Sequence, residues 1–124
     1  MFECIQARGV AFVSMPEKTS ASISRLNDLL RTQGIGGRVV ATPFIVNLSQ
    51  NTRASILEAI RNFEDFTPDN DPYGEHDFGS VNIEGNRFFF KIDYYDPTME
   101  RHSDNPADPE RTVRVMTVMC SDEY

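Results

Sequence analysis

The stretch that decides the fold is VNIEGNRFFFKIDYYD, residues 81–96. Successive side chains of an extended strand point to opposite faces, so residues 87–95 divide into two sets. One face receives Phe88, Phe90, Ile92 and Tyr94, and the other receives Phe89, Lys91, Asp93 and Tyr95. Between the two strands, Glu84-Gly85-Asn86 is a tight-turn sequence in which glycine and asparagine accept positive φ. The stretch therefore predicts a β-hairpin with aromatic side chains on both faces of its second strand.

Two segments upstream of the hairpin have helical periodicity. The first spans residues 20–33 and places on one stripe Ile23, Leu26, Leu29 and Leu30. Thr19 or Ser20 suits its N-cap, and Gly34 suits its C-terminal stop. The second begins after Ser49 and places on one face Ile56, Leu57, Ile60 and Phe63. It should end near Asp65, because the residue before the next proline avoids helical backbone angles.

Two further strands complete the predicted fold. A β-branched run predicts one strand over 38–42, and RTVRVMTVMC, residues 111–120, is apolar on both faces and so predicts a central strand. Residues 97–110 hold three prolines without periodicity, which is typical of a surface loop. The fold class is α+β, with two helices packed on one face of a mainly antiparallel sheet of about four strands. Residues 19–124 should form this single domain, after an N-terminal extension of residues 1–18.

Composition favours a cytoplasmic protein. The 124 residues include two cysteines, Cys4 and Cys120, at opposite ends of the chain. This placement predicts neither a disulfide framework nor a zinc knuckle and suits a reducing compartment. The N-terminus carries Glu3 where a signal peptide would be positive, and no apolar run is long enough to span a bilayer. We therefore expect no membrane contact.

Charge is distributed unevenly around a net value of −7. Residues 1–63 carry seven Lys/Arg against four Asp/Glu, whereas residues 64–124 carry five against fifteen, a balance of −10. An acidic half of this kind argues against direct contact with nucleic acid phosphates. It is suited to a protein partner with a basic surface, although acidic surfaces also serve solubility alone.

The densest acidic segment is FTPDNDPYGEHDFG, residues 66–79, and three interpretations of it compete. As a metal loop, Asp69, Asp71 and Gly74 match positions 1, 3 and 6 of a calcium-binding pattern. Tyr73 and Ser80, however, stand where that pattern has further oxygen ligands. Because the match is partial, divalent-metal binding is one of three hypotheses for the loop.

The second interpretation is catalytic. His76 lies between Glu75 and Asp77 and would be a general base, joined by Lys91, Asp93 and Asp96 from the neighbouring strand. Neighbouring residues of an extended chain point in opposite directions, so both flanking acids cannot reach one site with His76. No nucleophile elbow or phosphate loop accompanies the histidine.

The third interpretation is structural. Thr67-Pro68-Asp69-Asn70 and Asp71-Pro72-Tyr73-Gly74 both read as turns, in which Asp bonds its own backbone and Pro takes the second position. In this reading Phe66 and Phe78 bury on either side of the loop and hold the acids outward. His76 would bond to an acid or backbone group, and neutralising Asp69 and Asp71 would leave stability nearly unchanged.

The candidate contact residues combine this loop with the outer face of the hairpin. They are Asp69, Asp71, Tyr73, Glu75, His76, Asp77, Lys91, Asp93 and Tyr95. No cofactor is expected, and the sequence leaves the oligomeric state open.

Four long peptides carry a family resemblance: RLNDLLRTQGIGGRVVATP, FEDFTPDNDPYGEHDFGSV, RFFFKIDYYDP and DPADPERTVRVMTVMCSDEY. Together they resemble a family of small uncharacterised proteobacterial proteins, a domain of unknown function often carried by plasmids or phages. The resemblance covers roughly residues 23–124 and implies no agreed activity, so it assigns no catalytic residue. Carriage on mobile elements suggests accessory roles, including inhibition of host defence.

The leading functional prediction is a small, non-enzymatic, acidic binding protein that engages a basic protein partner. A mobile-element-encoded inhibitor of a nucleic-acid-targeting defence complex would fit this description, because carboxylates can occupy grooves built for phosphate. The alternative is a metal-dependent hydrolase or divalent-metal-binding regulator that uses Asp69, Asp71, His76 and Asp93.

Overall fold

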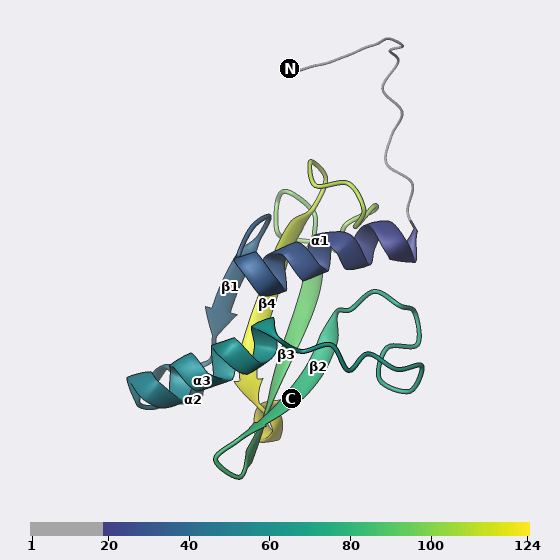
Figure 1. The fold of residues 1–124 in the computed structure, drawn as a ribbon. Helices are drawn as coiled ribbons and strands as arrows, with labels where there is room; N and C mark the ends of the chain where they lie inside the picture. Colours follow the sequence, from purple (N-terminus) through teal and green to yellow (C-terminus); the bar gives the residue numbers. More distant parts are fainter. Residues whose placement is uncertain (1–18) are drawn as a thin grey trace, which may run out of the picture.

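The computed structural model describes residues 19–124, and the predicted extension 1–18 lies outside the described residues (Figure 1). The elements follow one another as α1 (Ser20–Gln33), β1 (Arg38–Ala41), α2 (Pro43–Val46), α3 (Gln50–Arg61), β2 (Phe78–Ile83), β3 (Asn86–Tyr95), β4 (Val113–Cys120) and the 3-10 turn η1 (Ser121–Glu123).

The four strands form one sheet in the order β1-β4-β3-β2. β3 pairs antiparallel with β2 and β4, whereas β1 pairs parallel with β4. The two long helices, α1 and α3, lie on the same face of the sheet (Figure 1). The predicted α+β class, with two helices on a mainly antiparallel four-stranded sheet, is confirmed, as is the central place of the last strand.

The helix limits follow their capping residues. Thr19 caps α1 through its side chain, and Gly34 ends α1 in the left-handed region at φ 70°. Ser49 caps α3, but this helix ends at Arg61 instead of near Asp65. The sequence prediction also missed the four-residue α2, which Pro43 begins at a position where its absent N–H costs nothing.

The hairpin turn differs from its prediction in one respect. The residues at positive φ are Glu84 (55°) and Gly85 (83°), whereas Gly85 and Asn86 had been predicted. Two consecutive residues at positive φ suit the right-handed twist of the paired strands. The first strand of the hairpin begins at Phe78.

The core lies between the helices and the sheet, and its α1 side is partly polar. The buried residues of α1 are Ile23, Asn27, Leu30 and Arg31. Leu26 and Leu29, which were predicted to share the buried stripe, are only partly covered. Two of the four buried positions on this helix therefore carry side chains that need hydrogen-bond partners inside the protein.

The loop 97–112 is more deeply packed than a surface loop, which corrects the prediction. Ser103, Ala107 and Asp108 are buried. The Ser103 hydroxyl lies 2.7 Å from that of Thr112, so the loop closes on itself through polar contacts. Among residues 19–124, none of the helices combines the length and the apolar character that crossing a bilayer requires.

Candidate functional site

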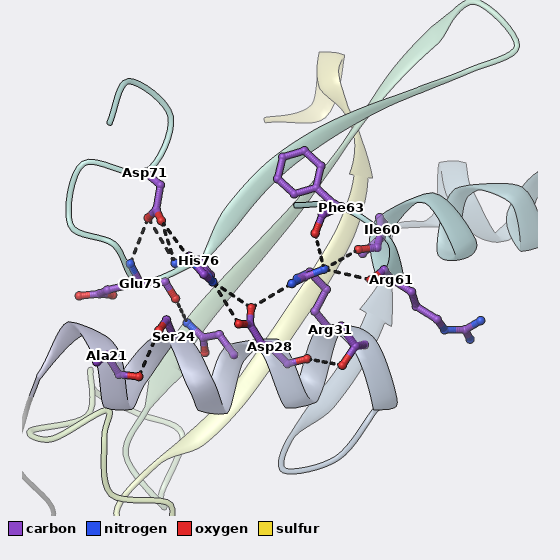
Figure 2. A network of polar contacts seen from close by, with 12 residues as sticks. Ala21, Ser24, Asp28, Arg31, Ile60, Arg61, Phe63, Asp71, Glu75 and His76 are labelled. Atoms are coloured by element: carbon purple, nitrogen blue, oxygen red, sulfur yellow. Dashed lines mark hydrogen bonds and ion pairs between the residues drawn. The ribbon is translucent and has the colours of Figure 1, made fainter. Parts of the chain in front are cut away.

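The acidic loop, residues 64–77, lies beside α1 and is bonded from within (Figure 2). The Asn70 side chain accepts from the Thr67 N–H at 2.8 Å and donates to the Asp65 carbonyl at 2.8 Å. The Asp71 carboxylate accepts from the N–H groups of Glu75 (3.1 Å) and His76 (3.2 Å). These bonds fix the course of the loop without using the carboxylates of Glu64, Asp65 and Asp69.

His76 joins the loop to α1. Its Nδ1 lies 3.0 Å from Asp28 Oδ1, and its Nε2 lies 3.8 Å from Asp71 Oδ2. The imidazole stacks on Phe66, with ring centroids 4.0 Å apart and an interplanar angle of 5°. His76 itself is at φ 59°, a strained conformation for a residue with a Cβ. The prediction that His76 bonds to an acid or a backbone group is confirmed, and its partner is Asp28, an acid of the first helix.

Arg31 links the same site to the end of α3. Its Nη1 donates to the carbonyls of Ile60, Arg61 and Phe63, and its Nη2 donates to Asp28 at 2.9 Å (Figure 2). A cation at these carbonyls also suits the negative end of the helix dipole. Its Nε has no hydrogen-bond acceptor within residues 19–124, but the guanidinium carbon lies 5.3 Å from the centre of the Phe66 ring.

A second set of polar contacts lies deeper, between α1 and the sheet. Asn27 donates to the Tyr94 hydroxyl at 2.8 Å and to the Glu75 carbonyl at 2.9 Å. Tyr94 in turn donates to the Glu75 carboxylate at 2.9 Å. Burial raises the pKa of Tyr94 far above its ordinary value, although its bond with Asn27 opposes the shift. The phenol is therefore a hydrogen-bond donor throughout the physiological range.

Arg114 completes this set from β4. Its Nε donates to the Asn27 side-chain oxygen at 2.6 Å, and its Nη2 donates to the carbonyl of Pro106 in the loop 97–112. The guanidinium carbon lies 5.1 Å from the centre of the Tyr94 ring. Burial lowers the pKa of Arg114, whereas Tyr94 and Glu75 act in the opposite direction. One buried arginine thus ties together the helix, the sheet and the loop.

An open groove of about 430 Å³ adjoins the first set of contacts. It is lined by Asp28, Arg31, Thr32, Glu64, Phe66 and His76. The Asp28 carboxylate contacts both Arg31 and His76, yet the Asp28 side chain is still 39% exposed. Within residues 19–124, no three His, Cys, Asp or Glu side chains are placed to hold a metal ion together.

The predicted contact residues do not form one site. Asp69 and Tyr73 are exposed at the outer side of the loop, and Glu75 and His76 are partly buried at its inner side. Asp71 is buried, so the expectation that the loop acids point outward is wrong for this residue. Its carboxylate turns inward because it supplies the acceptor for two loop N–H groups.

Lys91, Asp93 and Tyr95 lie on the opposite face of the sheet from His76. The burial of β3 alternates, with Tyr94 packed against α1 and Asp93 turned away. Lys91 Nζ instead lies 3.4 Å from Asp93 Oδ1, on the face where Phe78, Phe89 and Tyr124 make a ring cluster. The catalytic grouping of His76 with Lys91 and Asp93 is therefore wrong, because the sheet lies between them.

Sequence reasoning missed five residues of the site: Asn27, Asp28, Arg31, Tyr94 and Arg114. A signal for three of them was present. Asn27 and Arg31 are four apart and fall on the same helical stripe as Ile23 and Leu30. A polar residue on an apolar stripe must be given a partner, so it marks a buried contact. Arg114 likewise occupies an inward position of a central strand.

Replacing His76 tests the contact between the loop and α1. His76→Ala should lower the free energy of unfolding by about 1–3 kcal/mol, since it removes the bond to Asp28 and the stack on Phe66. His76→Gly should be less damaging, because glycine accepts the positive φ at no steric cost. Urea denaturation of both variants measures the difference. An alanine variant as stable as the wild type would contradict the role given to His76.

Asp71 and Asp69 provide a matched pair of acids in one loop. Asp71→Asn should lower the free energy of unfolding by about 1–2 kcal/mol, because a weaker acceptor replaces a buried carboxylate that holds two N–H groups. Asp69→Asn, at an exposed position, should change it by less than about 0.5 kcal/mol. Equal effects in thermal melts would show that Asp71 does not brace the loop. Nearly unchanged stability is therefore expected for Asp69→Asn alone, and not for a variant that also changes Asp71.

Asp77 should make the protein less stable as pH rises. Burial raises its pKa above the ordinary value of 3.8, and the carboxylates of Glu75, Asp71 and Asp93 add to the shift. The folded state then holds the proton more tightly than the unfolded state, so stability is lost as pH rises from 3.8 through the raised value. Asp77→Asn should therefore raise the melting temperature at pH 7, and the gain should shrink toward pH 3.8. A gain independent of pH would contradict this assignment.

Comparison with known proteins finds one family, and its match covers most residues of this site. Residues 41–123 match the family described as "Protein of unknown function (DUF3768)". The match starts at the last residue of β1 and includes the acidic loop and strands β2 to β4. Helix α1, which supplies Asn27, Asp28 and Arg31, lies outside the matched residues. No curated protein and no solved structure matches the chain.

Proposed function

We propose that this chain, which belongs to the DUF3768 family of proteins of unknown function, is a binding protein for a basic protein partner. The proposal rests on the different roles of the inner and the outer side chains of the acidic loop. Its inner side chains hold the loop to the body of the protein, and its outer side chains point to solvent. A rigid loop of this kind presents charge without an ordering cost on binding.

The outer side of the loop combines charge with one aromatic residue. Glu64, Asp65 and Asp69 are exposed, and none of their carboxylates takes part in the bonds that fix the loop. Tyr73, at the tip, is 77% exposed. Tyrosine is one of the residue types that dominate binding energy in protein interfaces, because it buries a large rigid surface and still offers a hydroxyl.

The adjoining groove would receive a cationic side chain of the partner. A lysine or arginine placed there would bring its charge between Asp28 and Glu64, with its apolar stem against Phe66. Carboxylates at the groove also favour fast association with a basic surface, and salt should weaken that association.

We further propose that the partner is a nucleic-acid-targeting defence complex. Such complexes hold phosphates in basic grooves. Residues 64–124, with a charge balance of −10, would present negative charge to such a groove as the phosphates of a nucleic acid do. The residues that would enter the basic groove are the exposed acids of the loop together with Tyr73.

A comparative pull-down from a native host tests the proposal. The full chain serves as bait beside two variants that each lose three exposed negative charges. The loop variant is Glu64→Gln/Asp65→Asn/Asp69→Asn, and the control is Glu100→Gln/Asp104→Asn/Glu110→Gln. Mass spectrometry should find a basic protein that the wild type and the control retain, and that the loop variant and Tyr73→Ala lose.

Two outcomes would overturn the proposal. One is the absence of any specifically retained protein at low ionic strength. The other is equal retention by the loop variant and the control, since charge at any position would then suffice. A retained protein should also be released as the salt concentration rises, and retention that is insensitive to salt would point to an apolar surface instead.

A further inference from the structure

The outer edge of β1 is an exposed apolar surface far along the sheet from the acidic loop. All four residues of the strand are exposed, and Val39 and Val40 are exposed by 45% and 43%. The flanking exposed apolar residues are Ile35, Phe44 and Val46. An unpaired, apolar edge strand is a template for pairing with another strand, and stable proteins cover or charge such edges.

Space for another strand lies beside this edge. A groove of about 220 Å³ runs between β1 and α3 and is lined in part by Val39, Ala41, Ile56 and Leu57. A second hollow of about 600 Å³ shares Val39 and Leu57 and continues toward the end of α1. Figure 1 shows α3 and α2 extending past β1, beyond the edge of the sheet. The helices therefore overhang the place that a fifth strand would take.

The backbone direction of β1 shows which of its polar groups point away from β4. The Thr42 N–H donates to the Val118 carbonyl in β4. Because the polar groups of successive strand residues point to opposite sides, those of Arg38 and Val40 also face β4. The N–H and carbonyl groups of Val39 and Ala41 consequently face outward. The register with β4 further places the Val39 side chain beside Met116, on the helix face of the sheet.

We infer that a second copy of this chain covers the edge, by antiparallel pairing of two β1 strands about a twofold axis at Val39. In a continuous sheet, paired residues must share a face, so an antiparallel partner has to match odd positions with odd ones. Pairing Val39 with its own copy satisfies this rule. It also makes Val39 a hydrogen-bonded pair with both outward groups used, at a Cα separation of about 5.5 Å.

Charge supports a second copy as the occupant. In this register Arg38 lies opposite the other copy's Val40 and diagonal to its Thr42, a distance of about 7–8 Å that a long side chain spans. The Thr42 hydroxyl already bonds the Glu123 carboxylate at 2.8 Å. Within residues 19–124, Arg38 makes no ion pair. In the twofold dimer, Arg38 of each copy would pair with Glu123 of the other copy, which gives two equivalent ion pairs. Twofold dimers with self-complementary contacts are the commonest oligomers.

Two adjacent valines of nearly equal exposure provide the test. The full chain should show a concentration-dependent dimer by sedimentation velocity between low micromolar and near-millimolar protein. Val39→Glu puts two carboxylates face to face across the axis and should raise the dimer dissociation constant by at least about tenfold. Val40→Glu, opposite the other copy's Arg38, should leave that constant unchanged or lower it. Circular dichroism and melting curves verify that both variants fold.

A charge exchange provides an independent measurement. Arg38→Glu alone should weaken the dimer, and Arg38→Glu/Glu123→Arg should restore it. A monomer at every concentration would overturn the inference, including a monomer whose β1 amides resist hydrogen exchange, because the cover would then come from the same chain. A dimer that Val39→Glu leaves intact would place the interface elsewhere. Equal loss of the dimer in both valine variants would exclude the Val39 register.

Discussion

Arg114→Ala is expected to lower the free energy of unfolding by about 4 kcal/mol. Arg114 is 1% exposed, and its removal leaves a cavity among Asn27, Tyr94 and the loop 97–112. The Asn27 oxygen and the Pro106 carbonyl both lose their charged donor. Each buried acceptor without a donor costs about 1–3 kcal/mol, in addition to the cost of the cavity.

Urea denaturation measures this effect, and Arg87→Ala is the matched control. Arg87 is an exposed arginine at the start of β3, so its loss should change stability by less than about 0.5 kcal/mol. Arg114→Lys should fall between the two, because an ammonium retains the charge but cannot reach both acceptors in the arginine geometry. A loss below about 1 kcal/mol for Arg114→Ala would mean that the three elements do not depend on this contact.

Gly79→Ala should be the most damaging single-methyl change in the sheet, at about 3 kcal/mol. A Cβ at this position would overlap the Phe90 ring and come within 2.9 Å of Cε2 of Phe63. Phe90 is fully buried between the sheet and the helices, so its ring has no free space to enter. Glycine is required here because an aromatic ring occupies the space of its missing side chain.

A double variant that also changes Phe90 tests whether overlap causes this loss. If overlap causes the loss, Gly79→Ala/Phe90→Leu should be clearly more stable than the sum of its two single changes implies, because the smaller side chain makes room for the methyl group. Ser80→Ala, on the other face of the same strand, should have little effect. Additive effects of Gly79 and Phe90 in thermal or urea unfolding would contradict the overlap and leave backbone entropy as the cause.

The elements themselves could be predicted because their signals are local. Thr19 and Gly34 limit α1, Ser49 begins α3, and the alternation of residues 87–95 identifies β3. Each of these patterns depends on backbone geometry within a few residues, and that geometry does not depend on where the segment lies in the fold. The same locality explains the miss at α2, a single turn of helix too short to develop a period.

The composition of the site depended on packing between distant segments. Asp28 and His76 are 48 residues apart, and Asn27 and Arg114 are 87 apart. The sequence alone determined that residues 66–77 form an acidic, turn-rich loop between a helix and a strand. Only the tertiary structure decided that Asp71 turns inward, that His76 meets α1, and that the sheet separates His76 from Asp93. The physical reason is that a side chain's partner is fixed by which layers pack together, and local periodicity specifies a face of an element without specifying what covers it.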